Sequence, residues 1–165
     1  MNRFLRNVRK GFRRLVNTKT VTIDGITIST ESEGISKRVR EGLFKETYEE
    51  PERILIREAL SANDRVLEIG GGIGLVSLLC AKICGPQNVL TYEANPAMVA
   101  TIQRNYSFNN LTPTLRSKAI TAQGREVTFF LDNNIVSSSL HARDGAFRTS
   151  CFIRSNSTLE RRNSI

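Results

Sequence analysis

A glycine-rich loop constrains the fold of this chain more than any other feature. Residues 68–74 read Glu-Ile-Gly-Gly-Gly-Ile-Gly, and the short apolar run at residues 65–69 leads straight into Gly70. A helix is predicted over residues 74–83, stopped by Gly85-Pro86. Glycine at such a junction lets a ligand approach the backbone closely, and the following helix directs its unpaired N–H groups toward the loop. The segment therefore predicts a ligand-binding strand–loop–helix unit.

The spacing of the glycines narrows the class of ligand. A dinucleotide fingerprint, G-x-G-x-x-G, would need a glycine where Leu75 stands, and no Gly-Lys-Ser/Thr follows as a phosphate-binding loop requires. The pattern that fits is acid-x-G-x-G-x-G, with Glu68, Gly70, Gly72 and Gly74 at its fixed positions. An NAD-binding oxidoreductase is thereby disfavoured.

Glu93 is the second feature of the predicted site. It ends the second predicted strand, residues 88–93, and stands 19 residues beyond Gly74. A carboxylate at that point can accept hydrogen bonds from both ribose hydroxyls of an adenosine ligand. Its negative charge also favours a cationic ligand. The pair of features predicts a site for an adenosine-containing cation.

The glycine loop resembles the first motif of the class I methyltransferases, which bind S-adenosylmethionine. The wider pattern, over about residues 42–140, resembles the FkbM family of S-adenosylmethionine-dependent methyltransferases. The positions that carry this second resemblance are Tyr48-Glu49 with Glu52, Glu93-Ala94-Asn95-Pro96, Asn105, Asn109, Ala119-Ile120, Gly124 and Ser137-Ser138-Ser139.

The resemblance implies S-adenosylmethionine as cofactor and O-methylation of a sugar or related natural product, so the expected partner is a small-molecule or glycan acceptor. Carried over position by position, the floor of the cofactor site is formed by Glu68, Gly70, Gly71, Gly72, Ile73 and Gly74. Glu93 would hold the ribose, and Ala94 would border the adenine. Tyr48 and Glu49 would close over the cofactor, although Tyr48 also fits a packed aromatic at a helix start.

The order of the predicted elements favours an α/β, Rossmann-like class I methyltransferase fold. A helix with Pro51 in its first turn precedes the loop, and a helix over residues 96–108, capped by Asn95, follows Glu93. Strands are expected at residues 115–120 and 127–131. Alternating strands and helices imply parallel strands joined by right-handed crossovers. We place this domain at residues 42–140.

Residues 141–165 have little periodicity and are interpreted as a polar basic tail. The FkbM family continues with a strand bearing a Lys-x-Asp-x-Glu-Gly pattern, which residues 141–165 lack. We therefore expect the fold to be incomplete after the third strand region, with an exposed sheet edge and apolar face. The catalytic base cannot be assigned.

Residues 1–41 are predicted to form a basic amphipathic helix followed by a hairpin. Between Met1 and Thr22 there are seven basic residues and no acidic one, with apolar residues at helical spacing. This helix could dock on the domain with a solvated basic face, contact a membrane surface through residues 1–19, or bind nucleic acid. The hairpin turns at Asp24-Gly25, within residues 21–30, as a flap outside the main sheet.

Three cysteines do not form a disulfide framework, and Cys80 and Cys84 are expected to be buried apolar residues. With the single His141 they provide no convincing metal site. The thiols suit a reducing compartment, so a cytoplasmic location, with or without peripheral membrane contact, is expected. Two alternative functions stay open: an inactive cofactor-binding fragment, and a nucleic-acid methyltransferase, which the net charge of +8 suggests.

Overall fold

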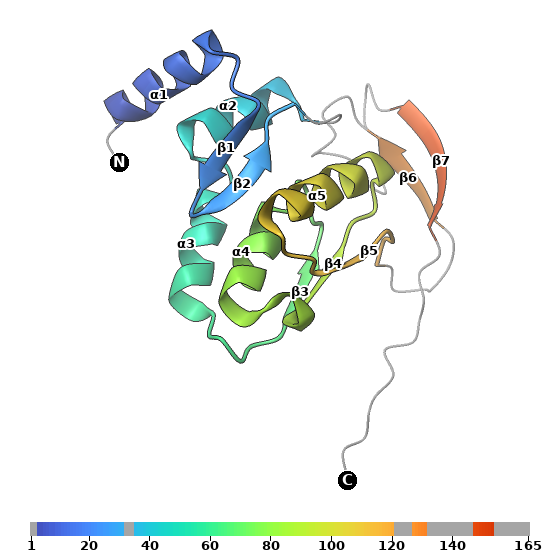
Figure 1. Cartoon of the computed structure of the whole chain (residues 1–165). Helices are drawn as coiled ribbons and strands as arrows, with labels where there is room; N and C mark the ends of the chain where they lie inside the picture. Colours follow the sequence, from blue (N-terminus) through green and yellow to red (C-terminus); the bar gives the residue numbers. More distant parts are fainter. Residues whose placement is uncertain (1–2, 32–34, 121–126, 132–146, 154–165) are drawn as a thin grey trace.

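The computed structural model describes residues 3–31, 35–120, 127–131 and 147–153. Helices and strands follow one another in the order drawn in Figure 1. The elements are α1 (Arg3–Leu15), β1 (Thr20–Ile23), β2 (Ile26–Ser29), α2 (Lys37–Lys45), α3 (Glu50–Ala59), β3 (Val66–Ile69), α4 (Leu75–Cys84), the 3-10 turn η1 (Pro86–Asn88), β4 (Val89–Tyr92), α5 (Pro96–Asn109), β5 (Thr114–Arg116), β6 (Val127–Leu131) and β7 (Phe147–Ile153).

The central sheet is parallel and has the strand order β3-β4-β5. This confirms the predicted strand–helix–strand–helix–strand unit and its parallel pairing. The third strand is shorter than predicted: β5 ends at Arg116, where the sequence suggested residue 120. The amide of Lys118 donates to the carbonyl of Arg116 at 2.9 Å, so the chain turns there and leaves the ladder.

Helices α4 and α5 lie on one face of this sheet (Figure 1). Leu75, Leu78 and Ile102 from these helices are fully buried. On β3, by contrast, Leu67 and Ile69 are 55% and 65% exposed, and they occupy alternate positions of the strand. Within the described residues β3 pairs with β4 alone. The expected exposed edge and apolar face are both present there.

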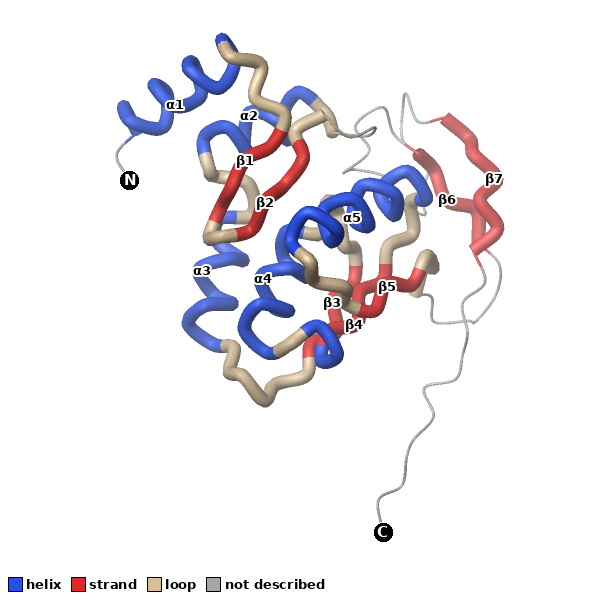
Figure 2. Tube along the Cα trace, viewed as in Figure 1, coloured by secondary structure: helices blue, strands red, loops and turns tan. Residues whose placement is uncertain are grey.

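The hairpin of β1 and β2 forms a separate two-stranded antiparallel sheet, apart from the central one (Figure 2). Asp24 and Gly25 both have positive φ, 52° and 74°, as the tightest hairpin turn requires. Ile26 and Ile28 are buried in the same cluster as Leu78 of α4 and Ile102 of α5. The hairpin thus covers the helical layer, and its position outside the main sheet is as predicted.

Helix α1 docks with the face opposite to the one expected. Its basic side chains form ion pairs with carboxylates of α2, α3 and the segment between them: Arg6–Glu50, Arg9–Glu46, Lys10–Glu41, Arg13–Glu46 and Arg14–Glu41. The apolar stripe faces solvent, with Phe12 64% and Leu15 85% exposed. The prediction of a solvated basic face is therefore wrong, because acidic side chains of the domain neutralise that face.

Helices α2 and α3 connect the hairpin to the first strand of the sheet. Residues 37–45 form α2, whose first turn is capped by the Ser36 hydroxyl accepting from Val39 N. Pro51 lies in the first turn of α3, as predicted. Arg53 of α3 is almost fully buried and donates to the carbonyls of Tyr48 and Glu46, besides pairing with Asp24.

The C-terminal segment contains a strand that the sequence analysis missed. Residues 147–153 form β7, antiparallel to β6, so residues 141–165 are not uniformly a tail. Phe147, Thr149, Cys151 and Ile153 occupy alternate positions, the period of a strand, which the surrounding basic and polar residues obscured. The run at residues 127–131 is confirmed as β6. Gly124, Ser137-Ser138-Ser139 and His141 lie outside the described residues.

The prediction that Cys80 and Cys84 are buried apolar residues is confirmed. Cys80 and Cys84 are free thiols on α4 with only 2% and 3% exposure, packed in an apolar cluster with Val89. Burial raises the pKa of the Cys80 thiol to about 12, which keeps it protonated and unreactive. Among the described helices, none is long and apolar enough to span a bilayer.

Candidate functional site

The glycine loop lies at the carboxyl ends of β3 and β4, where ligands bind in open α/β sheets. The amides of Gly70 and Gly71 both donate to the carbonyl of Tyr92, at 2.8 and 3.2 Å. The amide of Gly74 donates to the carbonyl of Gly71 at 2.8 Å and closes the turn into α4. The loop is therefore fixed by the backbone of the second strand before any ligand binds.

The glycines of this loop have different roles. A Cβ on Gly71 would lie 2.6 Å from Thr91 Cγ2 and 3.0 Å from Ile102 Cδ1, so this glycine is required by packing. Gly70 has φ +86°, and a Cβ there would meet no atom within 4 Å. Gly70 is thus required by backbone conformation and presents open space to a ligand.

Glu93 links the loop to the start of α5. Its Oε2 accepts from the amide of Gly72 at 3.0 Å, and its Oε1 accepts from the amide of Asn95 at 2.7 Å. The residue is 7% exposed, and burial raises its pKa despite these hydrogen bonds. Each carboxylate oxygen retains acceptor capacity, so Glu93 can both hold the loop and bind a hydroxyl group.

Glu68 supplies a second carboxyl beneath the loop. It is half-buried on β3 and accepts a hydrogen bond from the Thr91 hydroxyl at 2.8 Å. Burial, reinforced by the charge of Glu93, raises its pKa to about 7. A carboxyl with this pKa is partly protonated at neutral pH, and a cation that binds beside it shifts it toward the ionised form.

Tyr48 and Glu49 reach the loop from the segment before α3. Tyr48 Oη and Glu49 Oε1 lie 3.3 and 3.6 Å from the position that a Cβ on Gly72 would take. The Tyr48 hydroxyl is buried beside the Glu49 carboxyl, and among the described residues it makes no hydrogen bond of ordinary geometry. Burial also raises the pKa of Glu49 to about 7, and its left-handed backbone (φ 48°) is unusual for a glutamate. An unpaired hydroxyl facing a glycine loop is suited to a polar ligand.

Asn105 of α5 ties the loop to the hairpin, a role that the sequence pattern did not reveal. Its Oδ1 accepts from Ser29 N at 2.9 Å, and its Nδ2 donates to the carbonyl of Ile73 at 2.8 Å. One turn later, Asn109 pairs with both backbone groups of Thr27 at 2.8 Å. The spacing of four residues between two asparagines was the available signal.

The remaining predicted positions differ in burial. The Ile73 side chain is fully buried in the core, so only its backbone faces the loop surface, and Ala94 is half-buried between β4 and α5. The structure thus brings Tyr48, Glu68 and Glu93 together around the glycine loop, residues 70–74. Within the described part of the chain, no cluster of three or more His, Cys, Asp or Glu residues could hold a metal ion.

Comparisons with known proteins identify the family. The model of the TRM5/TYW2 methyltransferase domain matches residues 38–148. Among solved structures, the chain is similar to a Pyrococcus horikoshii protein provisionally described as a transferase, with 14% identity and a TM-score of 0.44. That similarity covers 69% of this chain and 47% of the other, so the chain spans about half the length of this relative. No curated protein matches the sequence significantly.

The matched family differs from the one that the sequence pattern resembled. The resemblance to methyltransferases that use S-adenosylmethionine is confirmed at that level, whereas the FkbM family itself is not supported. The match begins in α2, extends past β6 to the start of β7, and includes the glycine loop and Glu93. The chain therefore belongs to the TRM5/TYW2 methyltransferase domain family, whose methyl donor is S-adenosylmethionine.

Proposed function

We propose that this chain is the cofactor-binding part of a tRNA methyltransferase. The match to the TRM5/TYW2 methyltransferase domain over residues 38–148 carries the proposal. The net charge of +8 is consistent with a polyanionic acceptor and offers no advantage toward a neutral sugar. We infer a nucleic-acid acceptor in preference to the hydroxyl group of a sugar or related natural product.

The residues around the glycine loop fit S-adenosylmethionine chemically. Gly70 leaves open space at a positive φ, and Glu93 offers acceptor capacity for ribose hydroxyls within a fixed frame. The carboxyls of Glu68 and Glu49, both with pKa raised to about 7, can ionise when a positive charge arrives. The buried Tyr48 hydroxyl is available for a further hydrogen bond. These groups favour a cationic adenosine ligand over a dinucleotide.

When bound, S-adenosylmethionine supplies an electrophilic methyl group on a sulfonium. The residues of this chain contribute binding and orientation: Glu93 fixes the glycine loop through the amides of Gly72 and Asn95, and Asn105 holds the loop against the hairpin. Holding two reactants in a productive geometry is worth roughly 7–11 kcal/mol of barrier lowering. No catalytic base is assigned among the described residues.

Methyl transfer from radiolabelled S-adenosylmethionine tests the proposal. Unmodified tRNA transcripts and a panel of oligosaccharides are offered as separate acceptors, with acid-precipitable or extracted label as the readout. Incorporation into tRNA that Glu93→Ala abolishes is the expected result. Incorporation into the oligosaccharides with none into tRNA would overturn the nucleic-acid acceptor.

An inactive cofactor-binding fragment is the second candidate, favoured by the exposed face of β3, where Leu67 and Ile69 are uncovered in the described structure. A chain of this kind would bind S-adenosylmethionine and show no transfer to any acceptor. Affinity of tRNA for the chain, measured with and without the cofactor, separates the two: an increase with cofactor supports the proposed acceptor, and no tRNA binding supports the fragment.

A further inference from the structure

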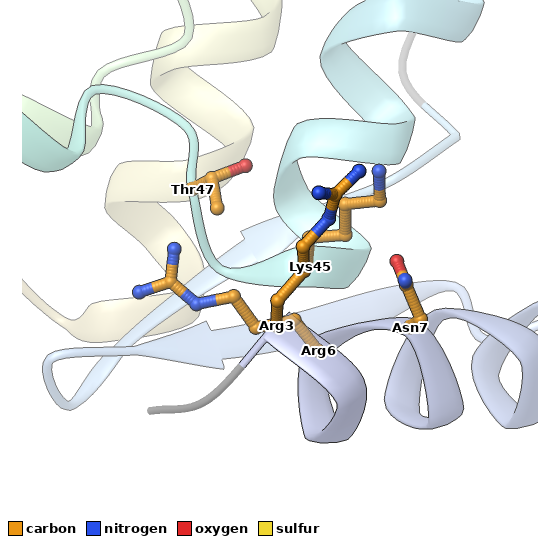
Figure 3. A pocket seen from close by; sticks show the side chains of 5 residues that line it. All are labelled: Arg3, Arg6, Asn7, Lys45 and Thr47. Carbon is orange, nitrogen blue, oxygen red and sulfur yellow. The ribbon is translucent and has the colours of Figure 1, made fainter.

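A cation-lined pocket lies between the first two turns of α1 and the segment that leads from α2 to α3 (Figure 3). Its volume is about 610 Å³. Arg3, Arg6 and Lys45 line it, together with Asn7 and Thr47, and no acidic residue is among these lining residues. Three positive charges and two neutral hydrogen-bonding side chains are the donor set that a phosphate group requires.

The charges of this pocket are only partly neutralised. Both terminal nitrogens of Arg6 donate to the carboxylate of Glu50, at 2.9 and 2.6 Å, and its Nε is buried without a partner. Arg3 and Lys45 form no ion pair with a carboxylate of the described residues. Glu50 therefore offsets one charge of three, and the pocket keeps a net positive charge.

The neighbouring carboxylates of Glu41 and Glu46, within the part of the chain that the structure describes, are already engaged by other cations. Glu46 forms ion pairs with Arg9 and Arg13 of α1, and Glu41 forms ion pairs with Lys10 and Arg14 of the same helix. Each carboxylate thus already serves two cations. The first turn of α1 also lacks an acidic residue, so the positive end of the helix dipole adds to the field at the pocket.

The pocket is connected to the glycine loop through three consecutive residues. Thr47 lines the pocket, whereas Tyr48 and Glu49 approach Gly72. Three residues span at most about 10 Å. The next residue, Glu50, begins α3 and holds Arg6. The pocket and the glycine loop are therefore close enough for one polynucleotide to contact both.

We propose that the pocket formed by Arg3, Arg6, Asn7, Lys45 and Thr47 binds a backbone phosphate of the polynucleotide acceptor. The inference rests on the proposed function, because it takes the acceptor to be RNA. It adds a contact outside the matched family region, since Arg3, Arg6 and Asn7 precede residue 38. This contact would set the register of the RNA on the domain without reading its sequence.

Fluorescence anisotropy of a labelled, unmodified tRNA transcript tests the pocket. Binding is measured for the wild-type chain and for Arg3→Gln/Lys45→Gln at several salt concentrations. The matched control, Arg104→Gln/Lys118→Gln, removes the same two charges from α5 and the segment after β5. Neither variant removes an ion pair seen among the described residues, and thermal unfolding verifies that both fold.

The pocket variant is expected to lose about tenfold in affinity, and the slope of log affinity against log salt is expected to shrink by about 1 to 2. The control is expected to retain wild-type binding within about twofold. Equal losses in the two variants, or none in the pocket variant, would overturn the phosphate site.

The outcomes separate this inference from the proposed function. Pocket-dependent tRNA binding without any methyl transfer would contradict the proposed function and would still support the phosphate site. A wild-type chain that binds no polynucleotide would overturn both. Binding of phosphatidylserine vesicles that the pocket variant loses, with unchanged tRNA binding, would assign the pocket to a membrane headgroup and contradict the proposal.

Discussion

The amide of Gly72 donates to Oε2 of Glu93 at 3.0 Å, which joins the glycine loop to the acidic residue after the second strand. The same carboxylate accepts from Asn95, the cap of α5. One buried side chain thus fixes both the glycine loop and the start of α5. Glu93, which is predicted to bind the ribose hydroxyls, therefore also fixes the geometry of the site before the cofactor binds.

Gly71→Ala is expected to destabilise the fold by about 1–3 kcal/mol. Its Cβ would lie 2.6 Å from Thr91 Cγ2, and neither that strand nor Ile102 can move without disturbing the core. Denaturant unfolding measures the loss. Gly71→Ala that unfolds at the wild-type midpoint would show that the loop packs less tightly than described.

Asn105→Ala is expected to cost about 2–4 kcal/mol, because it leaves the amide of Ser29 and the carbonyl of Ile73 buried without partners. Asn109→Ala, at the more exposed end of α5, is expected to cost less. The two variants are compared by chemical denaturation. A larger loss for Asn109→Ala would contradict the assigned role of Asn105.

The pH dependence of stability follows from the two carboxyls with raised pKa. Between about pH 4.5 and 7 the folded chain retains protons on Glu49 and Glu68 that the unfolded chain releases. The free energy of unfolding is therefore expected to fall across this window, by roughly 1–3 kcal/mol per carboxyl, and to level off above it. Glu68→Gln should flatten the fall, as measured by urea unfolding at a series of pH values. A slope unchanged by the substitution would show that Glu68 ionises normally.

The exposed stripe of α1 allows a specific test of membrane contact, one of the three alternatives for residues 1–19. Val8 and Phe12 point away from the domain, and a phenylalanine inserted into a bilayer interface contributes about 2 kcal/mol. Val8→Ser/Phe12→Ser is expected to weaken co-sedimentation with phosphatidylserine vesicles at least tenfold. The control is Leu67→Ser/Ile69→Ser, on the exposed face of β3. Equal vesicle binding by both variants and the wild type would exclude residues 1–19 as the contact.

Local signals predicted most of the elements that position the site. The glycine loop, the cap by Asn95 and the Asp24-Gly25 turn each depend on residues adjacent in sequence, and each is found where the pattern placed it. The separation between Gly74 and Glu93 along the sequence is accounted for by one helix and one strand of ordinary length. These features required no knowledge of long-range packing.

Long-range contacts account for what the sequence did not reveal. The orientation of α1 depends on Glu41, Glu46 and Glu50, which are separated from the arginines that they bind by 27 to 44 residues. Asn105 would ordinarily mark the solvent side of a helix, yet it is buried because β2 offers backbone groups to it. The family assignment also needed the comparison, since a shared cofactor site leaves the acceptor undetermined.

Calorimetric titration of S-adenosylmethionine into the chain tests the central claim most directly. The wild type and Glu52→Ala, which removes an exposed glutamate from α3, are expected to bind with similar affinity. Glu93→Ala is expected to lose binding by at least a hundredfold, since it removes the ribose acceptor and frees the loop amides. Circular dichroism verifies that the variants are folded. A folded wild type that binds no cofactor, or binding unchanged by Glu93→Ala, would contradict the site described here.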